Sequence, residues 1–178
     1  AKPIVNIERI AVDAIADGSL YAEVIPTPLE EGYTLNASIS AVKPTGSKAM
    51  KQQSAGLNTG TDHAVRFRWD NVEQWNTETP NLYNLTLELC DKNRNTVHVY
   101  NERICFRTVE FRVKDGIYVN GTKVVLKGIN RHSFHPDGGR TTNKEISIMA
   151  GKLIKEMNIN AVRFHYAPDK HFMEVCDP

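Results

Sequence analysis

The chain has 178 residues and a formal net charge of +1, and its Lys and Arg side chains form no basic cluster. This balance gives no reason to expect a nucleic-acid partner. No apolar run approaches the roughly 18 residues that a membrane helix requires, so we expect no membrane partner either.

The three cysteines, Cys90, Cys105 and Cys176, have no tight spacing. They predict free and mostly buried thiols rather than a disulfide framework or a zinc site, and they leave the compartment open.

Apolar and polar residues alternate from the start of the chain to about residue 113. Such alternation is typical of strands with one solvated face. We expect strands over residues 7–14, 20–25, 33–41, 65–69, 83–89 and 97–106. About seven short strands in about 110 residues are typical of an immunoglobulin-like β-sandwich. The sequence therefore predicts such a sandwich over residues 1–110.

A hairpin is expected after the sandwich, because Asn120-Gly121 lies between two β-branched runs. Its second strand is predicted to continue to Ile129 and to break at Asn130. A loop with Pro136-Asp137-Gly138-Gly139 follows.

A helix is predicted next, with Thr142 and Glu145 as its capping box. Five apolar residues recur at helical spacing, which predicts one apolar face. They are Ile146, Met149, Leu153, Ile154 and Met157. A short strand over residues 160–164 and a second helix, opened by Pro168 and Asp169, complete the pattern.

Strand, helix, strand and helix in this order are typical of a (β/α) barrel, which requires about 250 residues in all. We therefore expect residues 111–178 to be the N-terminal part of a (β/α)8 TIM barrel, truncated after two units, in a chain that is mainly β. An incomplete barrel leaves apolar side chains without partners, which favours self-association. The residues expected to be uncovered are Ile146, Met149, Leu153, Val162 and Phe172.

Polar and ionisable residues follow the ends of both predicted barrel strands. They are Asn130, Arg131 and His132 after the first strand, and Arg163, His165 and Tyr166 after the second. Barrel enzymes place their active sites at this edge. Imidazoles here could hydrogen-bond the hydroxyls of a small polar substrate, and arginines could hold carboxylates ionised. The alternative is that these residues only connect the rim loops.

A metal site is a further alternative, because imidazole is the commonest metal ligand. The histidines of this region match no zinc motif, and no cysteine or carboxylate pair accompanies them. We therefore expect no metal ligands among these residues.

Four segments together resemble glycoside hydrolase family 2, the β-galactosidase type. Residues 127–136, Lys-Gly-Ile-Asn-Arg-His-Ser-Phe-His-Pro, resemble the segment that opens the family's catalytic barrel. Residues 160–166 are similar to its N-A-V-R-x-S-H-Y-P motif. Trp75 with residues 80–85 resembles W…P-x-L-Y-x-L of its immunoglobulin-like domain, and residues 104–107 resemble F-G-F-R.

The resemblance implies a role for each rim residue. It implies that His132 and His165 contact sugar hydroxyls, that Asn130 and Arg131 shape the same floor, and that Arg163 supports the catalytic carboxylates. Tyr166 is expected to support the site. The family has two residues between its Arg and its His, whereas here only Phe164 intervenes. This shorter spacing predicts a changed direction for the His165 side chain.

The implied activity of the parent protein is removal of a terminal β-linked sugar, with a β-galactoside as the expected substrate. The implied mechanism is retaining hydrolysis by two glutamates about 5 to 5.5 Å apart. In the family both glutamates lie on later barrel strands, so we expect this part alone to be inactive. The parent could use Mg²⁺ or Na⁺, and we expect no cofactor in this part. The alternative is a non-catalytic sandwich module that binds glycan or protein.

Overall fold

A computed structural model describes residues 3–27, 31–42, 53–56 and 64–176. The chain divides into two compact units. The first comprises Ala1–Glu110 with Tyr118–Thr122, and the second comprises Phe111–Ile117 with Lys123–Pro178. Among the described residues, no helix is both long enough and apolar enough to span a membrane.

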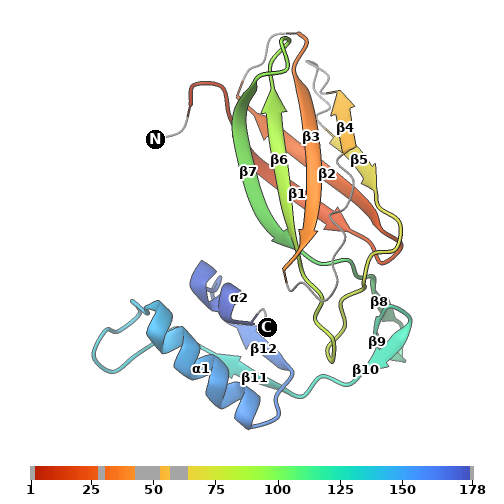
Figure 1. The fold of residues 1–178 in the computed structure, drawn as a ribbon. Helices are drawn as coiled ribbons and strands as arrows, with labels where there is room; N and C mark the ends of the chain where they lie inside the picture. Colours follow the sequence, from red (N-terminus) through yellow and green to blue (C-terminus); the bar gives the residue numbers. More distant parts are fainter. Residues whose placement is uncertain (1–2, 28–30, 43–52, 57–63, 177–178) are drawn as a thin grey trace. The chain divides into compact units, whose positions relative to one another are not determined.

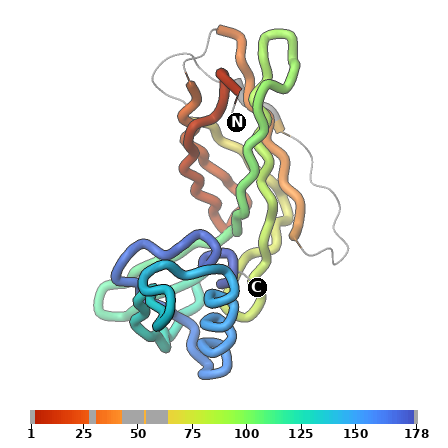
Figure 2. The backbone as a smooth tube through the Cα atoms, turned by 90° about the vertical axis from the view of Figure 1, so that its left-hand side faces the viewer, coloured from red at the N-terminus to blue at the C-terminus, as the bar shows by residue number. Residues whose placement is uncertain are grey.

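The first unit contains two antiparallel sheets, whose strands are labelled in Figure 1. One sheet has the order β1 (Ile7–Ala14), β2 (Ser19–Pro26), β5 (Ala64–Arg68). The other has the order β4 (Gln53–Gly56), β3 (Thr34–Ala41), β6 (Tyr83–Cys90), β7 (Thr96–Ile104). Figure 2 shows these two layers from the side. The predicted sandwich is therefore confirmed, with β4 as a strand that the sequence analysis did not predict.

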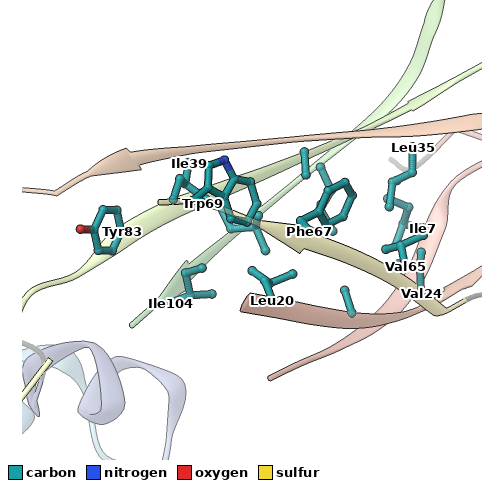
Figure 3. Close-up of a cluster of buried hydrophobic side chains, with 14 of the residues drawn as sticks. Ile7, Leu20, Val24, Leu35, Ile39, Val65, Phe67, Trp69, Tyr83 and Ile104 are labelled. Atoms are coloured by element: carbon teal, nitrogen blue, oxygen red, sulfur yellow. The ribbon is translucent and has the colours of Figure 1, made fainter. Parts of the chain in front are cut away.

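The core of the sandwich lies between the sheets, where side chains from both layers point toward one another (Figure 3). Alternation along each strand produces this core, since every second residue of β2 and β6 is buried. Trp69 is 3% exposed and stacks on Phe67 with a centroid distance of 5.7 Å. Its indole therefore fills the core.

A small sheet with the order β10 (Thr122–Val124), β9 (Gly116–Val119), β8 (Val109–Arg112) follows the sandwich. The predicted hairpin turn is confirmed, because Asn120 and Gly121 both have positive φ, 49° and 76°. The Asn120 side chain accepts from the Thr108 N–H at 2.9 Å and donates to the Trp75 carbonyl at 2.8 Å. These bonds explain why the turn groups with the first unit.

The second unit contains a parallel pair of strands, β11 (Gly128–Arg131) and β12 (Ala161–Phe164), and two helices, α1 (Lys144–Glu156) and α2 (Lys170–Cys176). The predicted continuous strand to Ile129 is wrong, since β10 ends at Val124 and β11 runs on through Arg131. Asn160 explains the break. Its side chain accepts from Lys127 N–H at 2.7 Å and donates to the Val125 carbonyl at 3.0 Å, which holds this segment at the start of β12.

Helix α1 begins differently from the predicted capping box. Asn143 is the N-cap, and its side chain accepts from the Ile146 N–H at 2.9 Å. At the other end Asn158 has a φ of 55° and donates to the Lys155 carbonyl, as expected for a helix stop. Gly151 permits α1 to approach α2, because a Cβ there would lie 2.7 Å from Val175.

The apolar face predicted for α1 is partly uncovered, and Met149 and Leu153 are exposed as expected for an incomplete barrel. Ser147 is fully buried, whereas Met149, Leu153 and Met157 are 51%, 51% and 59% exposed. The buried side of α1 therefore includes a small polar residue, and an apolar stripe faces solvent. Phe172, expected to be uncovered, is only 1% exposed.

Among the cysteines, Cys90 is buried, Cys105 is half-buried and Cys176 is exposed, and none of the three forms a disulfide within the described part of the chain. This agrees with the sequence prediction, which favoured thiols over a disulfide framework. The prediction of burial fails for Cys176.

Candidate functional site

The register of β11 and β12 determines which rim residues share a face. Asn130 lies opposite Arg163, and Arg131 lies opposite Phe164. Because successive side chains of a strand point to opposite faces, Asn130 and Arg163 share one face and Arg131 and Phe164 share the other. Because the strands are parallel, their carboxyl ends lie at one edge, where both chains continue into loops.

Three aromatic rings form a cluster just beyond this edge. The His132 and His165 rings stack with a centroid distance of 5.2 Å and an interplanar angle of 18°. The Tyr166 ring meets both edge-on, at 4.7 Å from His165 and 6.1 Å from His132. All three residues are exposed, with Tyr166 at 56%. We call His132, His165 and Tyr166 the rim cluster, because together they present ring nitrogens and a phenol to solvent.

Arg163 and Asn130 lie on the strand face next to the rim cluster. The Arg163 guanidinium donates to the Asn130 amide oxygen over 3.5 Å, the long end of hydrogen-bond distances. Within the described part of the chain, no carboxylate forms an ion pair with Arg163. Most of its donors are therefore available for a further acceptor.

Arg131 is not on the floor that the sequence analysis assigned to it. Its Cζ lies 4.2 Å above the Phe172 ring and 5.8 Å from the Phe164 ring. Burial lowers the pKa of Arg131, and the nearby Asp169 carboxylate opposes this shift. Arg131 lies there because successive side chains of a strand point to opposite faces, so Arg131 and Asn130 are on opposite faces of β11. Arg131 therefore covers Phe172.

Arg140 contacts one ring of the rim cluster, although the sequence analysis did not select this residue. Its Cζ lies 5.1 Å from the centroid of the Tyr166 ring. The turn before it is closed by two backbone hydrogen bonds between His135 and Gly139, each 2.8 Å long. No local pattern marks this arginine, because only the fold of the loop brings it to Tyr166.

The spacing after Arg163 is one residue shorter than in the family motif, and the His165 ring still stacks on the His132 ring. Arg163 and Pro168 are five positions apart, as Arg and Pro are in the motif N-A-V-R-x-S-H-Y-P. Counted in this way, His165 stands at the motif's Ser and Tyr166 at its His. Both rings contact the His132 ring.

The described residues contain no group of three His, Cys, Asp or Glu side chains that could hold a metal ion. The donor set near the rim cluster consists of imidazoles, a phenol and cationic guanidinium groups. It does not fit the carboxylate-rich ligands that Mg²⁺ prefers. We assign no ion to these residues.

Comparison with known families gives two matches that together span most of the chain. Residues 5–107 match glycosyl hydrolases family 2, and residues 111–178 match the TIM barrel domain of glycosyl hydrolases family 2.

Curated relatives include a β-galactosidase of Halalkalibacterium halodurans, which is 33% identical over 98% of this chain. A β-galactosidase large subunit of Latilactobacillus sakei is 37% identical over 60% of it. The chain spans only 18% and 17% of the lengths of these two relatives.

Solved structures with the same fold include two β-glucuronidases. That of Bifidobacterium dentium, complexed with coumarin-3-O-glucuronide, has a TM-score of 0.82 and 19% identity, over 97% of this chain and 29% of its own. That of Ruminococcus gnavus has a TM-score of 0.79 and 18% identity, over 98% of this chain and 28% of its own. With the sandwich, the parallel β/α pair and both family matches in agreement, this chain belongs to glycosyl hydrolase family 2, with a sandwich domain followed by the start of the TIM barrel domain.

Proposed function

We propose that the chain is part of a glycoside hydrolase that removes terminal β-linked sugars by a retaining double displacement. The observation that carries this proposal is the rim cluster beside Arg163 and Asn130, at the carboxyl edge of two parallel strands. In barrel enzymes that edge holds the active site. Its exposed rings and free guanidinium donors suit a small, hydroxyl-rich substrate.

Each residue has a role in this proposal. His132 and His165 hydrogen-bond sugar hydroxyls, and Asn130 shapes the floor beneath them. Arg163 holds a catalytic carboxylate ionised, because a nearby cation favours the charged form. Tyr166 packs edge-on against both imidazoles and limits their movement.

The sugar that we propose is galactose. The curated relatives named above are β-galactosidases, and one is similar over nearly the whole chain. The β-glucuronidase structures are less than 25% identical, so they support the fold but not the choice of sugar.

We also propose that this chain alone does not hydrolyse glycosides. Retaining hydrolysis needs two carboxyl groups about 5 to 5.5 Å apart. The glutamates nearest to the barrel strands in sequence lie in β8 or within the two helices, and none of them is on β11 or β12. They are Glu110, Glu145, Glu156 and Glu174. We infer that later barrel strands of the full-length protein supply both groups.

The test is hydrolysis of nitrophenyl β-galactoside, β-glucuronide and β-mannoside by the full-length protein, with this chain assayed alongside. His132→Ala in the full-length protein should lower kcat/KM for the best substrate by about 10²-fold, equivalent to about 3 kcal/mol. His135→Ala is the control, because the His135 ring faces Asp137 in the turn. It should stay within about two-fold of wild type.

Three outcomes would contradict the proposal. Failure of the full-length protein on all three sugars would favour a binding module. Equal effects of the two histidine variants would remove the assignment of His132. Turnover by this chain alone would refute the placement of the glutamates on later strands.

A related proposal concerns self-association. The stripe of Met149, Leu153 and Met157 is more than half exposed, and an uncovered apolar helix face favours contact with a second copy. We propose that this chain, purified alone, associates through α1. Light scattering should show dimers or larger species at high concentration, and Leu153→Glu should shift them toward monomer. A monomer at every concentration would contradict this.

A further inference from the structure

The two loops that carry the rim cluster are also tied together at their helix ends. Thr142 lies on the loop between β11 and α1, and Asp169 lies on the loop between β12 and α2. The Thr142 hydroxyl donates to the Asp169 carboxylate with an oxygen–oxygen distance of 2.7 Å. A hydrogen bond to a charged acceptor at this distance is stronger than a neutral one. The bond joins loops that are far apart in sequence.

His171 adds a second tie between the same elements. Its Nε2 lies 3.2 Å from the Thr142 carbonyl oxygen, which can only accept, so Nε2 carries the proton. In that tautomer Nδ1 accepts from the Ser147 hydroxyl over 2.8 Å. Ser147 is fully buried, so this bond satisfies a hydroxyl that water does not reach. The Asp169 carboxylate lies 3.8 Å from Nε2, beyond hydrogen-bond distance.

These ties lie close in sequence to the rim cluster. Asp169 follows Tyr166 by three residues, and Thr142 follows Arg140 by two. Segments this short span at most about 10 Å, and Pro168 restricts the backbone of one of them. The distance between Thr142 and Asp169 therefore constrains how the Arg140 guanidinium lies over the Tyr166 ring, 5.1 Å from its centroid.

We propose that Thr142, Asp169 and His171 are positioning residues for the site. They do not contact the sugar. They set the separation of the two loops and thereby hold Tyr166 against His132 and His165. This inference rests on the proposed function for its effect on hydrolysis, although the effect on ring geometry can be measured without it.

The test uses matched threonine variants. Thr142→Val removes the hydroxyl with little change of shape, whereas Thr142→Ser keeps a hydroxyl at this position. Thr141→Val makes the same change one residue earlier, where the hydroxyl forms no hydrogen bond in the described part of the chain. Asp169→Ala removes the acceptor from the other side and should reproduce the result of Thr142→Val.

The first readout is the NMR ring-proton shifts of Tyr166, His132 and His165 in this chain, recorded well below the unfolding temperature. Stacked and edge-on rings shift one another's protons, so loosening the loops should move these signals in Thr142→Val and Asp169→Ala. Thr142→Ser and Thr141→Val should keep them. The second readout is kcat/KM of the full-length protein, which should fall about 10-fold or more in the two disruptive variants, because small displacements of positioned groups reduce rate strongly.

A lower unfolding temperature with wild-type ring shifts in Thr142→Val and Asp169→Ala would overturn the proposal and leave the network a purely structural role. Equal changes in Thr142→Val and Thr141→Val would also overturn it. If the full-length protein hydrolyses none of the three sugars, the proposed function fails, and the ring shifts alone decide whether the network positions the rim cluster.

Discussion

Replacing Arg131 with Met should destabilise the second unit, because the guanidinium lies 4.2 Å above the buried Phe172 ring and 5.8 Å from Phe164. Both distances are within the roughly 6 Å over which a cation is attracted to an aromatic face, and a partly desolvated pair contributes about 1 to 2 kcal/mol. The 3.5 Å contact with the Ser133 hydroxyl adds little. Met retains most of the apolar stem, so the loss should be mainly that of the stacked charge.

Amide hydrogen exchange of β12 and α2 is the suitable assay, because it reports opening of the second unit directly. A loss of about 1 to 2 kcal/mol should raise their exchange rates by about 5- to 30-fold. Fluorescence of Trp69 and Trp75, both in the first unit, should be unchanged and serves as the internal reference. Arg140→Met is the matched control, since its ring partner Tyr166 is 56% exposed, and it should cost about 0.5 kcal/mol.

Equal exchange in the two variants, or no change in Arg131→Met, would refute the argument that Arg131 covers Phe172.

The positions of Arg131 and Arg163 on opposite strand faces also predict different effects on catalysis. In the full-length protein, Arg163→Met should lower kcat/KM more than Arg131→Met does, because only Arg163 shares the strand face of Asn130. The reverse order would return Arg131 to the floor of the site.

Three further predictions concern stability. Gly18→Ala should lower the free energy of unfolding in urea by about 2 to 4 kcal/mol. The φ of Gly18 is +88°, and a Cβ there would overlap the Trp69 carbonyl. A loss below about 1 kcal/mol would contradict this prediction. Asn143→Ala should lower the stability of α1 by about 1 kcal/mol, measured by circular dichroism, and Asn143→Asp should retain it. Hydrogen bonds from Asn95 lower the pKa of Asp91, so its stabilisation is present above pH of about 4 and is lost as pH falls through the folded pKa. Asp91→Ala should therefore show a weaker loss of stability than wild type between about pH 5 and pH 2, and an identical acid profile would contradict this.

Much of the fold followed from local patterns in the sequence. The sandwich strands were predictable because alternate burial requires alternate hydrophobicity, as the burial of β6 illustrates. The hairpin turn was predictable because Asn120 and Gly121 tolerate positive φ. The cap of α1 was misplaced by one residue, because Thr142 and Asn143 are both good caps and only the tertiary bond from Thr142 to Asp169 decides between them.

The candidate site was predictable in part. The sequence indicated which residues follow the strand ends, and the motifs of the family indicated His132, His165 and Arg163. The sequence did not show on which face of the strand each side chain lies. The face depends on the register of β11, because successive residues point to opposite faces. Arg131 was assigned to the floor for this reason.

The sequence by itself determined the class of the fold, the family and the residues that reach the barrel rim, because periodicity and motif order are local properties of the chain. The tertiary structure alone decided that Arg131 covers Phe172, that Arg140 reaches Tyr166, and that a threonine, an aspartate and a histidine join the two loops. Each of these contacts joins residues that lie far apart in the chain. They exist only once β11 and β12 have paired in one register and α1 has packed on α2.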